Sequence, residues 1–414
     1  MFKRSGGLLL SVCLIFSVIL CGSEVYAAGF QLFNELSAKA MGNSAAMSAR
    51  NDAAELAWFN PAGSSMMDTA QITAGGALIF PSMELDTGSD TPNMKHIAYP
   101  VPYLYGAMPI LKNLGASLSV NSPYGLTTEW DNDWTGRYRA HYTNLSSVFI
   151  TPALSYRPFE WLSVSAGVQF AYVDAEMRQY VSPLFPGLYT KIQGHDWGQG
   201  YILAAMVRPA KDWFLGMTYH SYVHFNIEGH AEYDIPSVLK PYSGLFPRSS
   251  VSLPLDLPPT LSFAASTTAL KNFRFSAEVL WTGWSTYSDL RFHYEQLPVT
   301  LQPGVVTVYK KWNDVVSLHF GVEYFLNDQW TLRASYAWDE SPIEDDYRDP
   351  TLPTNDRNVF GFGIGYQWNH LTVDTAYSYV SVEDSKPGEK VTPELDGTYK
   401  GYAHIANVSF SWTF

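Results

Sequence analysis

The chain ends on Phe410-Ser411-Trp412-Thr413-Phe414, with an aromatic ring at every second position and a small polar residue between the rings. The alternation extends backwards, where one face continues through Tyr402, His404, Ala406 and Val408 and the other through Asn407 and Ser409. A period of two predicts a β-strand with one apolar and one polar face. Because unpaired strand edges invite aggregation and a closed membrane barrel has none, this ending favours a transmembrane β-barrel.

The ending also resembles the C-terminal signal of bacterial outer-membrane barrels. Tyr402, Phe410, Trp412 and Phe414 carry this resemblance. It implies that the barrel assembly machinery is a partner of the chain.

The other end of the chain has the pattern of a secretory signal peptide. A basic start precedes an apolar run of 14 residues from Leu8 to Cys21, and small residues follow around Ala27. A membrane-spanning helix needs about 20 apolar residues, so the run is short for one. Lipid attachment at Cys21 is a second alternative, which the bulky Leu20 disfavours. We therefore predict a signal peptide over 1–27.

The composition narrows the classes of function. Both cysteines, Cys13 and Cys21, fall in the predicted signal peptide, so the remaining chain has no disulfide, thiol nucleophile or Cys-based metal site. A formal net charge of −13 argues against nucleic acid as a partner. The 13 Trp, 27 Tyr and 23 Phe fit a barrel with aromatic girdles at the membrane interfaces.

Residues 28–68 differ in composition from the chain that follows them. They are rich in Ala, Ser and Met, which suggests short helices, and Asn60-Pro61-Ala62 breaks regular structure with a turn. We interpret 28–68 as a compact unit outside the barrel wall and 69–414 as the barrel.

From about residue 70 onward, strand-like segments alternate with turns. The predicted strands are 70–80, 95–109, 114–127, 143–156, 161–180, 193–208, 212–230, 251–268, 271–294, 312–326, 329–341, 357–368, 370–384 and 399–414. Their number is even, as a single-chain bacterial barrel requires. Short turns alternate with long connections, which is typical of periplasmic turns and extracellular loops.

The alternation of side chains is clearest between residues 161 and 173. The face expected to meet lipid consists of Leu162, Val164, Ala166, Val168, Phe170 and Tyr172, and the face expected to meet the lumen begins with Ser163, Ser165, Gly167 and Gln169. A soluble β-sandwich shows the same alternation, so periodicity alone leaves both folds open.

Several segments, in their shared order, resemble the FadL family of outer-membrane transporters for long-chain fatty acids and hydrocarbons. They are Ala28-Gly29-Phe30-Gln31-Leu32, Asn60-Pro61-Ala62, Asn121 to Glu129, Trp281 to Ser285 and Trp338 to Pro342. The resemblance covers nearly the whole chain after the signal peptide. It implies an all-β fold, a 14-stranded antiparallel transmembrane β-barrel whose lumen is plugged by a small N-terminal helical hatch, residues 28–68.

The same resemblance implies a transporter for the uptake of hydrophobic small molecules, long-chain fatty acids or neutral hydrocarbons as in the TodX-like branch. Loop capture, an internal apolar pocket, rearrangement of the hatch and lateral exit through a kinked third strand are the implied steps. The chain is then a monomer in the outer membrane, in contact with lipid and lipopolysaccharide, with both termini in the periplasm.

Pro123, Tyr124 and Gly125 lie inside a strand pattern. Proline removes a donor from the strand ladder and glycine marks bulges, so the three residues predict a local break in pairing. An ordinary strand end is the alternative. The resemblance favours a lateral opening in the wall, through which apolar cargo passes sideways into lipid.

Gly29, Phe30 and the Asn60-Pro61-Ala62 turn are the expected gating residues of the hatch. The resemblance assigns them to the plug, and a chain end is easily displaced. The alternative is a remnant of signal cleavage together with a simple packing turn.

Two aromatic and apolar loop segments are candidates for ligand capture. Trp130, Trp134 and Tyr138 offer an apolar landing surface in the loop after the predicted break. Leu184, Phe185 and Leu188 are unusually apolar for a second loop. An interfacial girdle in contact with lipopolysaccharide is the alternative for the first set.

One departure from the family pattern bears on the cargo. Family members that carry fatty acids place basic residues in the internal pocket, and our approximate alignment puts Asp174 and Asn313 at two such positions. Neither pairs with a carboxylate as Lys or Arg does, and an acidic group repels one unless it is protonated. Neutral hydrocarbons therefore gain weight as cargo.

No sequence pattern indicates catalysis. G-x-S-x-G and P-loop motifs are absent from the sequence, and nothing pairs a specific Ser with a specific His. We expect that the protein is not an enzyme and that it has no catalytic residue, metal site or cofactor. A receptor or adhesin barrel is the alternative function, and an outer-membrane lipid hydrolase is a more distant one.

Overall fold

The computed structural model describes residues 30–296 and 304–414. The predicted signal peptide, 1–27, and Gly29 lie outside these ranges. Fourteen antiparallel strands close into a barrel, which confirms the predicted fold. Closure occurs at β1 (Gln71–Asp86), because Gln71 pairs with Ala107 on one side and with Thr413 on the other.

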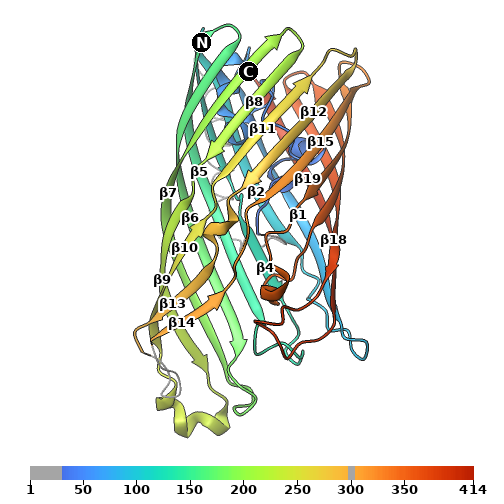
Figure 1. The fold of residues 1–414 in the computed structure, drawn as a ribbon. Coiled ribbons are helices and arrows are strands. Elements are labelled where there is room, and N and C mark those ends of the chain that lie inside the picture. The colour runs from blue at the N-terminus through green and yellow to red at the C-terminus, as the bar shows by residue number, and fades with distance from the viewer. Residues whose placement is uncertain (1–29, 297–303) are drawn as a thin grey trace, which may run out of the picture.

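Interruptions divide the barrel strands into nineteen segments (Figure 1). After β1 they are β2 (Tyr99–Leu111), β3 (Leu114–Asn121), β4 (Gly125–Glu129), β5 (Tyr142–Phe159), β6 (Leu162–Tyr180), β7 (Tyr189–Ala210), β8 (Trp213–His220), β9 (Val223–Asp234), β10 (Ser249–Leu257), β11 (Thr260–Thr267), β12 (Phe273–Thr282), β13 (Asp289–Tyr294), β14 (Val305–Tyr309), β15 (Val315–Phe325), β16 (Trp330–Asp339), β17 (Arg357–Trp368), β18 (Leu371–Ser385) and β19 (Thr398–Thr413).

Helices are few and short. They are η1 (Asn34–Leu36), α2 (Ala38–Met41), α3 (Leu56–Phe59), η2 (Pro61–Met66), η3 (Ser237–Leu245), η4 (Trp284–Thr286) and η5 (Asp345–Tyr347). Among the described residues, none of the helices has the length and apolar character needed to cross a membrane.

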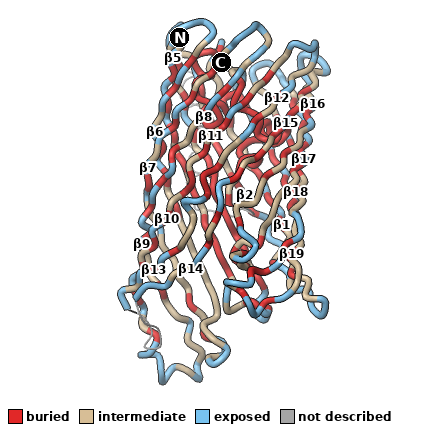
Figure 2. The backbone as a smooth tube through the Cα atoms, viewed as in Figure 1, coloured by how far each residue is buried: buried red, intermediate tan, exposed pale blue. Residues whose placement is uncertain are grey.

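The alternation predicted for residues 161–173 appears in β6. Ser163, Ser165 and Gln169 are buried, whereas Val164 and Val168 are exposed on the outside of the barrel. Figure 2 shows buried residues alternating with less buried ones along the strands of the wall. Burying the small polar residues inside is possible because the lumen is filled by protein.

The short turns and the C-terminal end of β19 lie at the same end of the barrel (Figure 1). A band of exposed aromatic residues surrounds this end: Phe159, Trp161, Trp213, Trp330, Trp368, Trp412 and Phe414. Rings of this kind form the interfacial girdle of an outer-membrane barrel. The girdle gives a physical reason for the terminal aromatic pattern.

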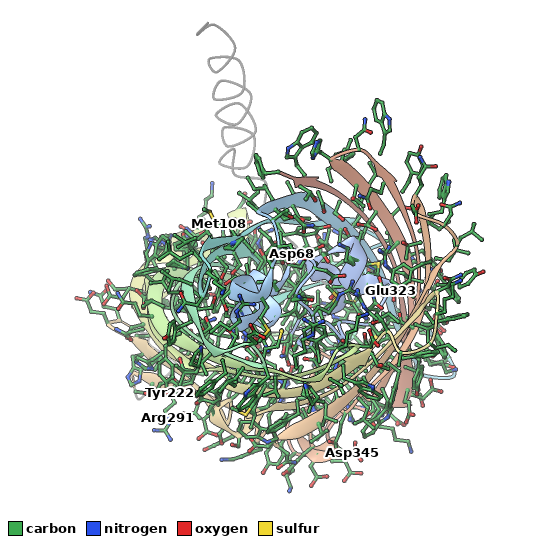
Figure 3. The ribbon with its side chains drawn as sticks, turned by 90° about the horizontal axis from the view of Figure 1, so that it is seen from above. Asp68, Met108, Tyr222, Arg291, Glu323 and Asp345 are labelled. Carbon is green, nitrogen blue, oxygen red and sulfur yellow. The ribbon has the colours of Figure 1, made fainter. Side chains whose placement is uncertain are left out.

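The filling of the lumen is residues 30–67, which we call the hatch; Figure 3 shows its short helices inside the ring of strands. Small wall residues let the hatch backbone come close. A Cβ atom on Gly216 of β8 would lie 1.9 Å from the Ser48 carbonyl oxygen, and one on Gly361 of β17 would lie 2.3 Å from that of Met41. The hatch is therefore pressed against the wall on several sides.

Candidate functional site

The wall has a break in strand pairing at residues 122–124. β3 ends at Asn121 and pairs with both β2 and β5, whereas β4 begins at Gly125 and pairs with β5. The ladder between β2 and β3 starts at Leu104, so residues 100–103 of β2 lie beyond the end of that ladder. The structure has its break where Pro123 and Gly125 predict one, and the role of the break as an opening stays a prediction.

The start of the hatch takes the place of the missing strand partner from inside the lumen. The Gly125 amide donates to the Phe30 carbonyl oxygen at 2.9 Å, and the Leu32 amide donates to that of Pro123 at 2.8 Å. Gln31 and Tyr124 form an isolated antiparallel bridge. We call residues 30–36 the hatch arm and residues 37–67 the hatch body.

Four aromatic side chains surround the ring of Phe30. They are Tyr124, Trp284, Tyr287 and Trp312, which we call the aromatic box. The residues come from the break, from η4 with its C-cap, and from the segment before β15. Of these only Tyr124 is among the residues that the sequence singles out for a site, because the others are distant in sequence and only the fold brings them together.

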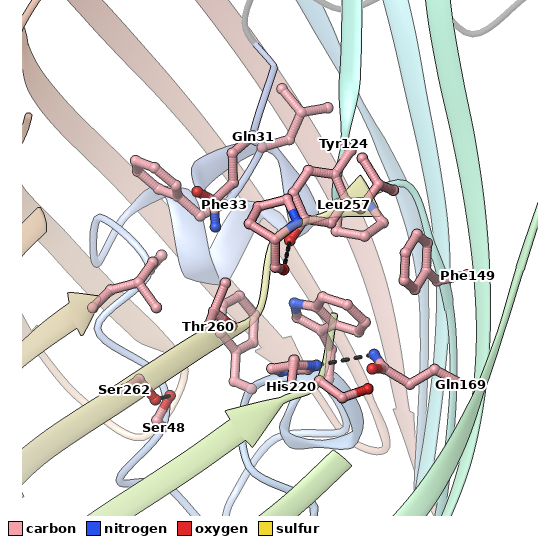
Figure 4. Close-up of a pocket in the computed structure, with 18 of the residues that line it drawn as sticks. Gln31, Phe33, Ser48, Tyr124, Phe149, Gln169, His220, Leu257, Thr260 and Ser262 are labelled. Atoms are coloured by element: carbon pink, nitrogen blue, oxygen red, sulfur yellow. Dashed lines mark hydrogen bonds between the residues drawn. The ribbon is translucent and has the colours of Figure 1, made fainter. Parts of the chain in front are cut away.

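A cavity of about 60 Å³, which we call the inner cavity, lies between the hatch and β5, β6, β8 and β10 (Figure 4). Trp58, Phe149 and Leu257 give it an apolar lining. Among its polar groups, Gln169 Nε2 lies 3.0 Å from His220 Nδ1, whereas Gln169 Oε1 and His319 Nε2 have no hydrogen-bond partner among the described residues. Such a lining suits an uncharged apolar molecule.

A second cavity of about 70 Å³, the gap cavity, lies between the hatch arm and the wall beside the break. Met83, Met94, Leu126, Val380, Val382 and Ala403 are among its apolar lining residues. The Arg357 side chain brings a positive charge to this lining, and its Nε donates to Asp339 Oδ2 at 2.7 Å. Burial raises the pKa of the nearby Glu35 carboxyl, and Arg357 opposes that rise.

The polarity of the wall is reversed in the half of the barrel farther from the short turns. In β9, Val223, Phe225 and Ile227 face inward and are buried, whereas His224 and Asn226 face outward and are exposed. A lipid-facing strand has the opposite arrangement. Figure 1 shows the wall around β9, β13 and β14 extending farther than the opposite side of the barrel, at the end away from the short turns, and we call this part the projecting wall.

The inward side of this projecting wall forms an apolar funnel. Its buried residues are Val223, Phe225, Ile227, Val251, Leu253, Leu255, Leu290 and Phe292, and Ala175, Met177 and Ile192 pack against them. The same cluster continues to Trp58 beside the inner cavity and to Phe30 in the hatch arm. One cluster of buried apolar residues therefore extends from the funnel to the break in the wall.

The predicted gating turn lies in the anchored part of the hatch. Asn60 Nδ2 donates to the carbonyl oxygens of Ser48 at 2.7 Å and Ala205 at 3.0 Å, and Asn60 Oδ1 accepts from the Ala62 amide. Pro61 occupies the first position of η2, where its missing donor costs nothing. These contacts favour an anchoring role for the turn and leave Phe30, in the arm, as the gating candidate.

A network of charges also fixes the hatch body to the wall. It joins Arg50 to Glu323 at 2.7 Å, Asp52 to Arg274 at 2.6 Å, and Arg333 to both Glu323 and Asp374 at 2.6 Å. Partial burial of Asp52 opposes its charge, but Arg274 and Arg50 hold the pKa of this carboxyl well below its usual value. No sequence signal indicates the network, because Arg50 and Asp52 of the hatch lie more than 200 residues from their partners Glu323 and Arg274 in the wall.

The capture candidates lie in different environments. Trp130 and Trp134 are buried and stack at 4.4 Å, and their Nε1 atoms donate to the carbonyl oxygens of Pro350 and Ala140. They form the core of a loop cluster instead of an exposed landing surface. Leu188 is also buried, whereas Leu184 is 84% exposed.

Tyr138 and Phe185 are half-buried. Together with Leu184 they leave an apolar edge at the loops, so capture stays a prediction for these three residues.

Asp174 and Asn313 do not line either cavity. Asp174 lies on the face of β6 opposite to Val173 and Ala175, which face the funnel, and Asn313 is exposed. Both residues therefore lie away from these two cavities, and their effect on the choice of cargo stays a prediction.

The interior does contain cations that the sequence did not single out. Arg357 pairs with Asp339, and Lys310 Nζ lies 2.5 Å from Asp349 Oδ2. Both cations are thus already compensated by a protein carboxylate.

Comparisons with known proteins agree with this architecture. The family model for "Outer membrane protein transport protein (OMPP1/FadL/TodX)" matches residues 18–414. The chain is 26% identical to the long-chain fatty acid transport protein of Escherichia coli O6:H1, over 96% of this chain and 97% of that protein. It is 24% identical to the putative outer membrane protein NMB0088 of Neisseria meningitidis serogroup B, over 97% and 98%.

Solved structures share the fold. A Pseudomonas aeruginosa FadL homologue superposes with a TM-score of 0.80 at 21% identity, covering 94% of this chain and all of that one. The P. putida toluene transporter TodX superposes with a TM-score of 0.72 at 16% identity, covering 92% and 99%. The matched family model describes transport proteins and not enzymes, in agreement with the sequence prediction, and this chain belongs to that outer-membrane family, OMPP1/FadL/TodX.

Proposed function

We propose that this protein takes up hydrophobic small molecules and releases them sideways into the outer membrane. The observation that carries the proposal is the cluster of buried apolar residues that extends from the funnel to the break, in a barrel whose projecting wall is apolar inside and polar outside. A water-filled pore for polar solutes would have the opposite lining. Apolar cargo follows such a surface because each contact removes apolar area from water.

The proposed route has four steps. Leu184, Phe185 and Tyr138 meet the cargo at the loops, and the funnel conducts it to the inner cavity. The hatch arm then leaves the break, and the cargo passes between β2 and β4 into lipid. The hatch body stays in place, since the charge network and the Asn60 contacts hold it.

The lining of the gap cavity favours uncharged cargo. Arg357 is the cation of the gap cavity and is held by Asp339, so a fatty-acid carboxylate has to compete with a fixed carboxylate for it. The relatives include proteins named for long-chain fatty acids and for toluene. Within that range, we place neutral hydrocarbons before ionised fatty acids.

The orientation follows from the girdle and the funnel. The short turns and both termini lie on the periplasmic side, and the funnel lies on the extracellular side, beside lipopolysaccharide. We also propose that the protein is a monomer and that the barrel assembly machinery inserts it by its C-terminal strand.

Two engineered disulfides test which part of the hatch moves. The chain has no cysteine after residue 21, so added pairs are the only ones in the processed protein. Gln31→Cys with Tyr124→Cys joins bridge partners in the arm and the break, and bridge geometry suits a disulfide. Oxidation is expected to abolish uptake of radiolabelled toluene or hexadecane by cells, and reduction to restore it to the level of Tyr124→Cys alone, because that variant also lacks the Tyr124 ring.

The matched control locks the hatch body. Ser64 and Ser155 lie with their Oγ atoms 2.7 Å apart, so Ser64→Cys with Ser155→Cys ties the body to β5. Uptake by this variant is expected to survive oxidation. Uptake that continues with the arm locked overturns the lateral route, and uptake that stops with the body locked overturns the fixed hatch body.

A further inference from the structure

The geometry of the aromatic box shows how closely it holds a ring. The Phe30 centroid lies 4.7 Å from that of Trp284, 5.2 Å from Tyr287, 5.5 Å from Trp312 and 6.3 Å from Tyr124. The plane of Trp312 is at 89° to that of Phe30, an edge-to-face contact. All four distances fall in the range of favourable aromatic pairs, about 4.5–7 Å.

The box is also supported by contacts that do not involve Phe30. Trp312 lies 4.9 Å from Trp284 and 4.6 Å from Tyr287, and Tyr124 lies 6.1 Å from Trp284. The Tyr124 hydroxyl donates to the Pro258 carbonyl oxygen at 3.1 Å. The four rings are therefore held in place by one another and by the wall, so the box is preorganised for a ring.

The box lies where the cavities meet. Tyr124 lines the inner cavity, and Gln31, next to Phe30, lines both the inner and the gap cavity. Phe30, Trp284 and Trp312 line a third, smaller cavity that also contains Gln31. A molecule that moves from the inner cavity to the break therefore passes the box.

We propose that the aromatic box is a binding site for a flat aromatic ring of the cargo, and that Phe30 occupies it as a tethered substitute. The inference rests on the proposed function and narrows its substrate class to molecules that carry an aromatic ring. The ring selectivity has a physical basis, because the quadrupole of an aromatic ring favours edge-to-face and offset contacts that a saturated ring of similar size does not make.

Replacement of the Phe30 ring by a cargo ring also connects cargo binding to opening of the break in the wall. Phe30 carries the carbonyl group that accepts from Gly125, so a cargo ring that takes the box removes the residue that holds the arm to the break. The cargo then opens the exit that it uses. A ligand without an aromatic ring displaces Phe30 less well, because it does not replace the aromatic contacts that Phe30 makes with the box.

The test compares toluene with methylcyclohexane, two molecules of similar size that differ in aromaticity. Binding of each to the purified barrel in lipid nanodiscs is measured by calorimetry for four proteins: the unmodified chain, Phe30→Ala, Trp312→Leu and Phe273→Ala. Phe273 is the matched control, since it contacts Phe275 at 5.9 Å and Tyr324 at 4.9 Å at the periplasmic end of the wall, away from the box.

Removal of the tethered competitor in Phe30→Ala is expected to tighten toluene binding about tenfold, with little change for methylcyclohexane. Trp312→Leu keeps an apolar wall but removes a ring, so toluene and methylcyclohexane are expected to bind equally. Phe273→Ala is expected to match the unmodified chain. Heat-modifiable migration on gels checks that each barrel is folded.

The ring site is ruled out if Phe30→Ala binds toluene and methylcyclohexane more tightly by the same factor. It is also ruled out if Trp312→Leu still prefers toluene. Uptake of labelled hydrocarbons by cells separates this failure from that of the transport function. If cells take up toluene and methylcyclohexane equally and depend on the protein for both, transport holds and the ring site fails. If neither uptake depends on the protein, the proposed function itself fails.

Discussion

At the scale of single residues, Glu323 links Arg50 of the hatch to Arg274 and Arg333 of the wall. Its carboxylate is 1% exposed and lies within 3.1 Å of Arg50, Arg274 and Arg333. Glu323→Gln leaves buried guanidinium groups without their shared partner, which is expected to lower the free energy of unfolding by about 3–5 kcal/mol. Urea unfolding in detergent micelles measures this loss. Glu160→Gln, in an exposed turn, is the control and is expected to change it by less than about 0.5 kcal/mol.

Sequence reasoning at this scale succeeded where the backbone itself carries the signal. Pro123 and Gly125 predict a break because their backbones cannot continue a regular ladder, and the structure has one there. It failed for the exposed surface expected of Trp130, because this ring is buried in the loop cluster. The aromatic box and the charge network were not predictable, since their members meet only after the barrel closes.

At the scale of elements, the contact between β8 and the hatch body determines whether the lumen is sealed. Gly216→Val places its Cβ atom 1.9 Å from the Ser48 carbonyl oxygen, so the body cannot seat. We expect this variant to conduct ions across planar bilayers, because the lumen behind a displaced plug is lined by polar residues. In β2, a Cβ atom on Gly106 meets no heavy atom within 4 Å, so Gly106→Val is the matched control.

Equal conductance of the two glycine variants would show that the hatch body does not seal the barrel. The strands themselves were predictable because a half-buried strand shows its period of two directly in the sequence. Interruptions such as those between β8 and β9 or between β10 and β11 were not, since the residues on either side keep the alternation of a continuous strand.

At the scale of the whole molecule, the reversal of polarity predicts how far the barrel stands out of the membrane. Asn226 on β9 and Leu203 on β7 are both exposed on the outer wall, but Leu203 belongs to the apolar band and Asn226 to the projecting part. In intact cells, a membrane-impermeant maleimide is expected to label Asn226→Cys and to leave Leu203→Cys unlabelled, because hydrocarbon excludes the charged reagent. The absence of other cysteines after residue 21 makes each label specific. Labelling of neither position would place β9 inside the bilayer, and the funnel would then receive its cargo from lipid and not from the extracellular medium.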